Sequence, residues 1–274
     1  MTNIYFKFIK LISVFEYIED KLGLLLGQRD KLTPPHRMFS DPDRVDGSNN
    51  IREFILIGEL TVRWLLECGL KSDHKVLDVG CGIGRMAIPL TKYLNRGSYE
   101  GLDITKEKVN YCRRTITKKH PNFNFQHADL YNKYYNPNGK YRAAEYKFPY
   151  ENGIFDFIFL ISVFTHMLPE DMDNYLNEIS RVLKYNGKCV ITFFLTNTKL
   201  GDPYIKYSEV CHIYDENYPE HGVFYNEEYI RTLFTKYGLK IEMMNYGSWS
   251  KREGSSRDSF QDRIIAYKKN KGTV

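Results

Sequence analysis

The sequence has no Cys-x-x-Cys pair, no membrane-length apolar run and no clustered stripe of basic residues. Its five cysteines are an odd number, so we expect reduced thiols, a cytoplasmic protein, and neither a zinc site nor a disulfide framework. The formal net charge is +5, and its 39 basic and 34 acidic residues are interspersed, which does not favour a nucleic-acid partner. We find no internal repeat and no low-complexity tail.

The N-terminal segment is apolar but repeatedly interrupted by charge. Lys7, Lys10, Glu16 and Glu19 fall within residues 3–27, and no small-residue cleavage site follows an apolar core. A membrane span and a removable leader are therefore not predicted. We expect residues 1–50 to form a helical extension that packs as a lid or a dimer contact, with weak peripheral membrane contact as the alternative.

From residue 51 onward, helical and strand patterns alternate. This order predicts an α/β fold in which a mostly parallel sheet has helices on both faces. The last two strand patterns have only a loop between them, so they predict an antiparallel C-terminal hairpin. The expected helices are 51–70, 84–94, 105–120 and 169–187, and the expected strands are 74–80, 98–104, 122–130, 155–164, 187–195, 239–249 and 259–269.

Two long segments rich in Tyr, Asn and Pro interrupt this alternation. One spans residues 131–153 and the other residues 196–228, and both fall within the single domain that we expect over residues 51–274. Both adjoin the carboxyl ends of strands, where open parallel sheets bind their ligands. Long loops are uncommon in compact domains unless they serve a function, so we expect these insertions to shape a pocket.

The stretch VLDVGCGIGR, residues 76–85, places Gly80, Gly82 and Gly84 directly after a predicted strand. A glycine-rich turn there lets backbone and its amides approach a ligand. Asp103 follows Gly84 by nineteen residues, at the end of the next strand, where a carboxylate can accept both hydroxyls of a ribose. A dinucleotide-binding fold would use the same acid, so these residues leave the cofactor open.

Two features favour S-adenosylmethionine over a dinucleotide. The turn reads Gly-x-Gly-x-Gly and lacks the glycine spacing that a pyrophosphate-binding turn uses. Asp129, at the end of the third predicted strand, offers an acceptor for the exocyclic amine of adenine.

Residues 51–269 resemble the class I S-adenosylmethionine-dependent methyltransferases. VLDVGCGIGR is similar to their first motif, LDIT to their second-strand acid and HADLY to their adenine contact, while FDFIFLISVFTHM and RVLKYNGKCVITFF match later elements. The resemblance implies a Rossmann-like seven-stranded sheet with the last strand antiparallel. RVLKYNGK departs from the Pro-Gly that many relatives carry, but Asn-Gly makes the same tight turn.

The resemblance also implies the cofactor contacts. The three glycines would flank the methionine part, Asp103 would hold the ribose, and Asp129 with the Leu130 amide would hold the adenine. The full set of expected cofactor-binding residues is Asp78, Gly80, Cys81, Gly82, Gly84, Arg85, Asp103, Ile104, Asp129, Leu130 and Ser162.

His166, in SVFTHM just after the fourth predicted strand, is the expected catalytic residue. An alcohol is a poor nucleophile, and an imidazole with a pKa near 6.5 can remove its proton. Asp171 and Asp173 could orient this ring, while the competing interpretation is that His166 caps the next helix or packs beneath the cofactor. His212 and His221 are alternative bases, and His127 would pack beside the adenine.

A divalent ion could bind a sugar diol, but the sequence offers no Asp pair or His cluster with ligand spacing, so no metal is predicted. No Asn-Pro-Pro-Tyr or Asp-Pro-Pro-Tyr follows the fourth strand, which disfavours methylation of DNA base amines. SVFTHM and the ending NYGSWSKREG…SFQDRIIAYKK are similar to methyltransferases encoded with genes for polysaccharides and specialised metabolites.

We therefore expect O-methylation of a sugar hydroxyl in a nucleotide sugar, a glycan end or a glycosylated metabolite. A phenol or amine acceptor is the first alternative, followed by RNA or protein methylation. The last alternative is a partner subunit that binds the cofactor without turnover. The Tyr-rich insertions could equally serve a homodimer interface.

Overall fold

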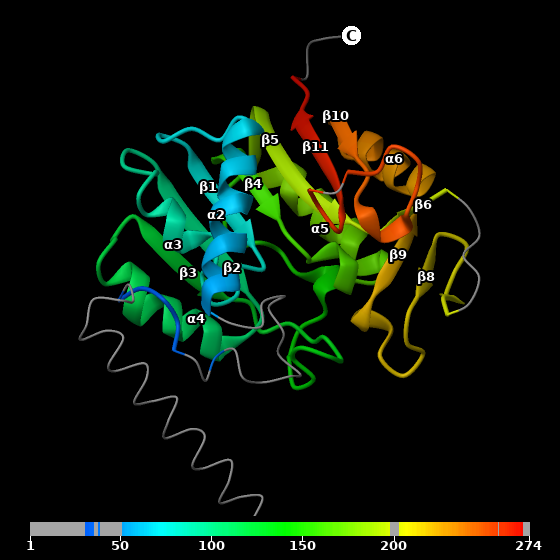
Figure 1. The fold of residues 1–274 in the computed structure, drawn as a ribbon, viewed down its shortest axis with the longest axis horizontal. Coiled ribbons are helices and arrows are strands. Elements are labelled where there is room, and N and C mark those ends of the chain that lie inside the picture. Colours follow the sequence, from blue (N-terminus) through cyan, green and yellow to red (C-terminus); the bar gives the residue numbers. More distant parts are fainter. Residues whose placement is uncertain (1–30, 36–37, 39–50, 198–202, 257, 271–274) are drawn as a thin grey trace, which may run out of the picture.

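The computed structural model describes residues 31–35, 38, 51–197, 203–256 and 258–270. Nearly all of the expected N-terminal extension, residues 1–50, lies outside these described residues. The described chain contains a large twisted sheet with helices on both sides, and a small second sheet beside it (Figure 1).

The large sheet has seven strands in the order β10-β11-β5-β4-β1-β2-β3. β11 runs antiparallel to both of its neighbours, and the other paired strands are parallel. The expected Rossmann-like fold, with its antiparallel C-terminal hairpin, is confirmed. The strands are β1 (Lys75–Val79), β2 (Ser98–Asp103), β3 (Phe123–His127), β4 (Phe155–Leu160), β5 (Leu183–Phe193), β10 (Leu239–Asn245) and β11 (Asp262–Lys268).

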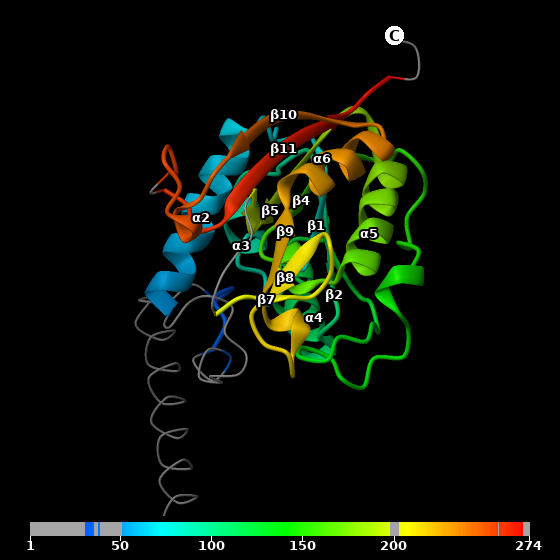
Figure 2. The ribbon, with the colours of Figure 1, turned by 90° about the vertical axis from the view of Figure 1, so that its right-hand side faces the viewer.

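Two buried apolar clusters lie on opposite faces of this sheet, because successive strand residues point to opposite sides. Val76 of β1 belongs to the cluster that α2 (Ile51–Glu67), α3 (Ala87–Leu90) and α4 (Lys106–Cys112) cover. Leu77 belongs to the cluster that α5 (Pro169–Val182) and α6 (Glu227–Lys236) cover. Figure 2 shows α2 and α5 on the two sides of the sheet.

Several helix boundaries differ from the sequence predictions. The pattern over 84–94 contains only a four-residue helix, α3, followed by turns. The pattern over 105–120 changes from α-helix to a π-helical turn, Arg113–Thr117. α5 ends at Val182, earlier than predicted, because β5 already begins at Leu183.

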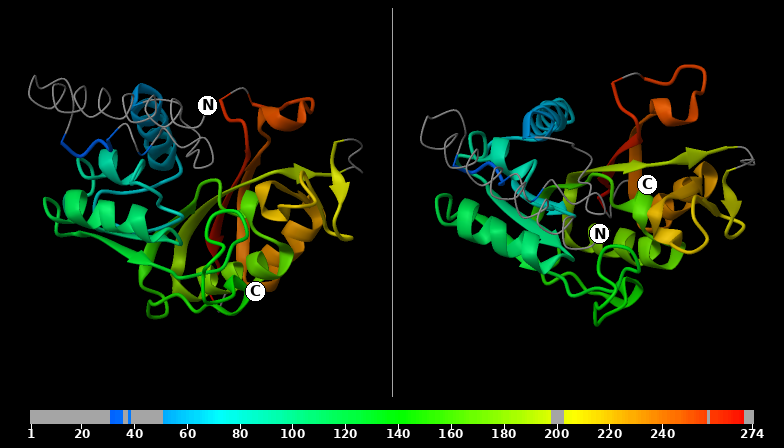
Figure 3. Two further views of the ribbon diagram at one scale, coloured as in Figure 1. Left: turned by 90° about the horizontal axis from the view of Figure 1, so that it is seen from below. Right: turned by 60° about the horizontal axis from the view of Figure 1, so that its bottom comes forward.

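The second insertion is not a simple loop. It contains β7 (Ile205–Lys206), β8 (Cys211–Ile213) and β9 (Val223–Asn226), which form a four-stranded sheet with β6 (Leu195–Thr196). Figure 3 shows this sheet at the far side of the molecule from α2 to α4. The helix α6 was not predicted either, although Asn226 caps it by accepting a hydrogen bond from the Tyr229 amide.

This architecture brings the ends of β1, β2, β3 and β4 to one edge of the sheet, and the start of β11 joins them there. The segments that follow these strands carry most of the residues singled out from the sequence. Among the described residues, no helix combines the length and the apolar character needed to cross a membrane.

Candidate active site

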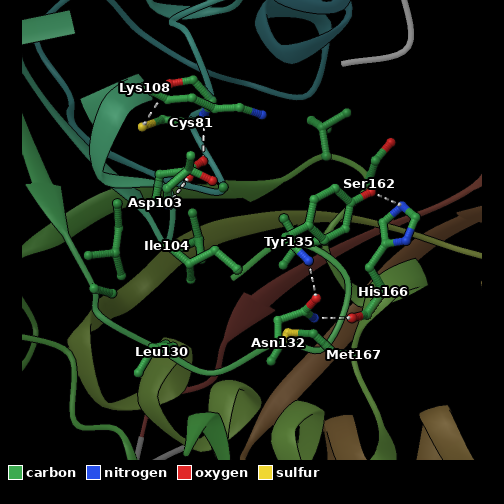
Figure 4. A pocket seen from close by; sticks show the side chains of 18 of the residues that line it. Cys81, Asp103, Ile104, Lys108, Leu130, Asn132, Tyr135, Ser162, His166 and Met167 are labelled. Atoms are coloured by element: carbon green, nitrogen blue, oxygen red, sulfur yellow. Dashed lines mark hydrogen bonds between the residues drawn. The ribbon is translucent and has the colours of Figure 1, made fainter. Parts of the chain in front are cut away.

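A cavity of about 350 Å³ lies at this edge of the sheet. The glycine turn after β1, the end of β2, the segment after β3, the segment after β4 and the first turns of α5 all line it. Figure 4 shows Asp103, Cys81 and Lys108 at one end, with Tyr135 and His166 at the other. The cavity therefore joins residues that lie far apart in the chain.

The glycine turn requires glycine for backbone geometry and for space. Gly80 and Gly84 have φ angles of +83° and +86°. A Cβ at Gly80 would lie 2.4 Å from a methyl carbon of Val163, and one at Gly84 would lie 2.6 Å from Ile116. Side chains at either position would therefore both strain the backbone and clash.

The amides of the three glycines and of Cys81 bond to protein groups, so they are not the free donors that the sequence suggested. The N–H groups of Gly80 and Cys81 donate to the Leu102 carbonyl at 2.7 and 3.2 Å. These bonds hold the turn against the end of β2. The glycines supply close approach of the backbone rather than free hydrogen-bond donors.

Asp103 links the turn to β2. Its Oδ2 accepts from the Gly82 amide at 2.8 Å, and its Oδ1 accepts from the Thr105 amide at 2.7 Å. Asp103 also lines the cavity. Each carboxylate oxygen has a second lone pair, so the side chain can accept further hydrogen bonds from a ligand.

Most of the residues expected to bind the cofactor share this cavity. Gly84 lies behind the turn against Ile116, and Asp78 and Asp129 are also outside the lining. The expected residues that line the cavity are Gly80, Cys81, Gly82, Arg85, Asp103, Ile104, Leu130, Ser162 and the candidate base His166.

Asp78 is fully buried beneath the turn. The Tyr99 hydroxyl donates to its Oδ2, and its Oδ1 has no hydrogen-bond partner. Burial raises the pKa of this carboxyl to about 7, an increase that the Tyr99 hydrogen bond limits. Asp78 therefore supports the turn from inside the fold.

Asp129 lies at the rim, with its carboxylate 3.8 Å from the Lys140 ammonium. Its backbone carbonyl accepts from the amides of Lys140 and Tyr141. The neighbouring Leu130 amide donates to the Ala128 carbonyl at 2.8 Å. Leu130 lines the cavity, its amide already has a protein acceptor, and the Asp129 carboxylate has an ion-pair partner.

His166 lies in a short 3₁₀ turn, Phe164–His166, between β4 and α5. Its Nδ1 is 2.9 Å from the Glu220 carbonyl, which can only accept, so Nδ1 carries the proton in the neutral ring. Nε2 is then the unprotonated nitrogen, and it lies 3.4 Å from the Tyr135 hydroxyl. Burial lowers the pKa of His166, and the hydrogen bond to Glu220 partly opposes this effect.

Both insertions hold this histidine. Asn132 donates to the His166 carbonyl at 3.3 Å and accepts from the Tyr135 amide at 2.8 Å, so it positions base and hydroxyl together. Tyr135 also contacts the His166 ring edge-on, with centroids 5.2 Å apart. Glu220 of the second insertion supplies the carbonyl that bonds Nδ1.

The predicted orienting carboxylates take other partners. Asp173 forms an ion pair with Lys236 at 2.8 Å. Asp171 lines the cavity and accepts from the Ala144 amide, while Nδ1 of His166 donates to the Glu220 carbonyl.

Ser162 and Gln261 form the wall beside the glycine turn. Ser162 has a φ of +58°, its amide donates to Thr192 at 2.8 Å, and its hydroxyl donates to Gln261 at 3.1 Å. A non-glycine residue with positive φ is uncommon, and here two hydrogen bonds hold it. The loop before β11 thereby reaches the cavity.

The other histidines within the described residues lie outside the lining. His221 stacks on Tyr134 with ring centroids 5.0 Å apart, His212 lies in β8, and His127 contacts the Ile104 carbonyl through Nε2. Within the described ranges, no group of three or more His, Cys, Asp or Glu is placed to hold a metal ion.

Several polar lining residues were not assigned to the site from the sequence, among them Asn132, Tyr135, Tyr175 and Gln261, and Asp171 was considered only as a group that could orient His166. Tyr175 and Asp171 lie one helical turn apart, so the period of α5 could have shown that they share a face. Asn132, Tyr135 and Gln261 lie in irregular segments, where no periodic pattern indicates which side chains point inward.

Residues 76–187 match the family model described as a methyltransferase domain. The sheet around them has the fold of solved S-adenosylmethionine-dependent methyltransferases. One from Aquifex aeolicus superposes with a TM-score of 0.50 and 22% identity, covering 84% of this chain and 95% of that one.

Two curated relatives match about half of the chain. Methyltransferase GfsG of Streptomyces halstedii is 26% identical over 48% of this chain and 42% of its own length. Malonyl-[acyl-carrier protein] O-methyltransferase 1 of Ilyobacter polytropus is 28% identical over 52% of this chain and 48% of its own. The chain spans less than half the length of these two relatives.

The buried Asp78 makes a prediction about stability. Its carboxyl ionises near 3.8 in the unfolded chain but near 7 in the fold, so the folded protein binds a proton that the unfolded chain lacks between these pH values. As the pH rises from 3.8 to about 7, the free energy of unfolding of the wild type should fall, relative to that of Asp78→Asn, by about 1.4 kcal/mol per pH unit. Urea titrations at several pH values measure this, and parallel pH curves for the two proteins would contradict it.

Proposed function

We propose that this protein is an S-adenosylmethionine-dependent O-methyltransferase whose acceptor is a sugar hydroxyl and whose general base is His166. The observation that carries the proposal is one continuous cavity with the Asp103-bound glycine turn at one end and the unprotonated Nε2 of His166 at the other. A donor and an acceptor could therefore meet inside a single enclosure.

The cofactor end suits S-adenosylmethionine in shape and charge. Asp103 has lone pairs available for the two ribose hydroxyls, and Gly80 and Gly82 line the cavity without side chains that would occupy it. Ile104, Leu130 and Met167 line the same cavity and offer apolar surface to a purine. When bound there, the cofactor supplies an electrophilic methyl group on a sulfonium.

The acceptor end suits deprotonation of a hydroxyl. The lowered pKa keeps His166 neutral at pH 7, and the Nδ1 hydrogen bond leaves Nε2 as the basic atom. If a bound acceptor oxygen attacked the methyl carbon, the bond from that carbon to the sulfonium sulfur would break, S-adenosylhomocysteine would leave, and the hydroxyl proton would pass to Nε2. The Glu220 carbonyl then stabilises the imidazolium, because it continues to accept from Nδ1.

Aromatic and amide groups near His166 support a sugar acceptor. Tyr131, Tyr135 and Asn132 line the cavity, and a tyrosine ring offers apolar surface to the C–H face of a pyranose while its hydroxyl remains polar. These three residues come from the first insertion, 131–153. The second insertion, 196–228, acts through the Glu220 carbonyl, and its described residues do not line the cavity.

The O-methyltransferase assignment also has support from a relative, because the Ilyobacter polytropus protein is named as one. The alternative acceptor is a phenol or an amine of a small metabolite. The rings of Tyr131 and Tyr135 in the cavity lining favour it, because a flat aromatic molecule could stack on them.

Transfer of labelled methyl from S-adenosylmethionine to a panel of acceptors tests the proposal. The panel contains nucleotide sugars, simple glycosides, an oligosaccharide extract, phenols and bulk tRNA. We expect label in a sugar-containing fraction, in a form stable to the alkaline hydrolysis that releases methyl esters. Label confined to phenols or tRNA would contradict the sugar acceptor, and cofactor binding without label in any fraction would contradict transfer to the acceptors tested.

Replacing His166 by alanine tests the base. We expect His166→Ala to lower kcat by about 100-fold or more, because acceptor deprotonation loses its base. Affinity for S-adenosylhomocysteine should change only slightly, since the ring lies away from Asp103 (Figure 4).

His120→Ala is the matched control, because His120 packs on Phe123 at the opposite end of β3 and lies outside the cavity lining.

The wild-type kcat should fall at acidic pH with a midpoint below 6.5, the direction in which burial moves the pKa of His166. Unchanged turnover in His166→Ala would exclude the histidine as base.

A further inference from the structure

The lone pair of Nε2 on His166 already has a hydrogen-bond donor in the structure. Nδ1 donates to the Glu220 carbonyl, so Nε2 of the neutral ring carries no proton and can only accept. The contact of 3.4 Å between Nε2 and the Tyr135 hydroxyl is therefore a hydrogen bond from the tyrosine to the histidine. Because Nε2 has a single lone pair, an acceptor hydroxyl cannot donate to it while Tyr135 does.

Tyr135 is held in this position by three other residues. Its amide donates to Oδ1 of Asn132 at 2.8 Å, and Nδ2 of Asn132 donates to the His166 carbonyl at 3.3 Å. Its ring contacts the rings of His166 and Tyr134 edge-on, with centroids 5.2 Å and 4.8 Å away. Moving the side chain aside would break both ring contacts and the hydrogen bond to Nε2. These contacts favour a tyrosine that stays in place when an acceptor binds.

A phenol hydroxyl can donate and accept hydrogen bonds at the same time. While Tyr135 donates its proton to Nε2, the lone pairs of its oxygen can accept from another hydroxyl. Tyr135 and His166 both line the cavity, so an acceptor bound there can reach the tyrosine oxygen (Figure 4). The acceptor, Tyr135 and His166 would then form a chain of two hydrogen bonds that ends at Nε2.

We propose that Tyr135 is a catalytic residue that relays the proton of the acceptor hydroxyl to His166. The relay rests on the proposed O-methyl transfer. When a bound acceptor oxygen attacks the methyl carbon and the bond from that carbon to sulfur breaks, the acceptor proton moves to the Tyr135 oxygen. The original Tyr135 proton moves to Nε2 in the same step. Tyr135 is neutral before and after the step, and the positive charge lost by the sulfonium appears on the imidazolium of His166.

Tyr135→Phe in the full-length protein tests the relay, because it removes the hydroxyl and keeps the ring. The assay is transfer of labelled methyl to the acceptor that takes label in the panel described above. We expect kcat to fall about tenfold or more, because the relay has lost its middle group. Affinity for S-adenosylhomocysteine should stay at the wild-type value, since Tyr135 and Asp103 lie at opposite ends of the cavity (Figure 4).

Tyr134→Phe is the matched control, because it removes a hydroxyl from the adjacent tyrosine. The Tyr134 ring contacts Tyr135 and stacks on His221, but Tyr134 lies outside the cavity lining. This variant should keep the wild-type kcat. An equal loss in the two variants would contradict the relay, because it would show that any change in this aromatic cluster slows the enzyme.

The pH dependence separates the relay from a packing role. In Tyr135→Phe the neutral imidazole loses the donor to Nε2, so the pKa of His166 should rise. The base must be neutral, and activity is lost as the pH falls through this pKa. The acidic midpoint of kcat should therefore move to higher pH than in the wild type. If Tyr135 only packed against the imidazole, the midpoint would not move, because phenylalanine retains the ring contact.

The double variant Tyr135→Phe, His166→Ala completes the set. It should be no slower than His166→Ala alone, because a relay without its final base carries no proton. Losses that multiply would overturn the relay, and so would an unchanged or higher kcat in Tyr135→Phe. If the wild type labels no acceptor, the proposed transfer fails and the relay fails with it. If the wild type labels an acceptor and Tyr135→Phe is equally fast, the relay alone is wrong.

Discussion

The hydrogen bond from the Gly82 amide to the Asp103 carboxylate is the interaction on which the site depends. It joins the turn after β1 to the end of β2, and the two amide bonds to the Leu102 carbonyl reinforce it. Neighbouring parallel strands end at the same edge of a sheet, so the pairing of β1 with β2 places these groups within reach. Glycine at positions 80 and 84 is what allows the turn to pack so closely against Val163 and Ile116.

The other end of the cavity is organised by contacts between distant segments. His166 is held by Asn132 and Tyr135 from one insertion and by the Glu220 carbonyl from the other. The small sheet β6 to β9 supports the segment that carries Glu220, and β6 begins two residues after β5 ends. The two Tyr-rich insertions therefore act together, because both fix the orientation and the tautomer of a single imidazole.

The sequence predicted the parts of the molecule that have local patterns. The alternating elements, the antiparallel hairpin, and the positions of the glycine turn and Asp103 at the ends of the first two strands all follow from periodicity and spacing. The sequence did not show that Asp78 lies inside the fold, because a strand-end acid can point inward to Tyr99 or outward to a ligand with the same pattern.

Asn132, Tyr135 and Gln261 escaped prediction for a different reason. Each lies in an irregular segment and acts through contacts that are 31 to 99 residues apart in sequence, such as Tyr135 with His166 and Gln261 with Ser162. The most direct test of the site is calorimetric binding of S-adenosylhomocysteine to the wild type and to Asp103→Ala. We predict one site per chain and a loss of affinity of at least tenfold in the variant; equal affinity in the two proteins would contradict the role of Asp103.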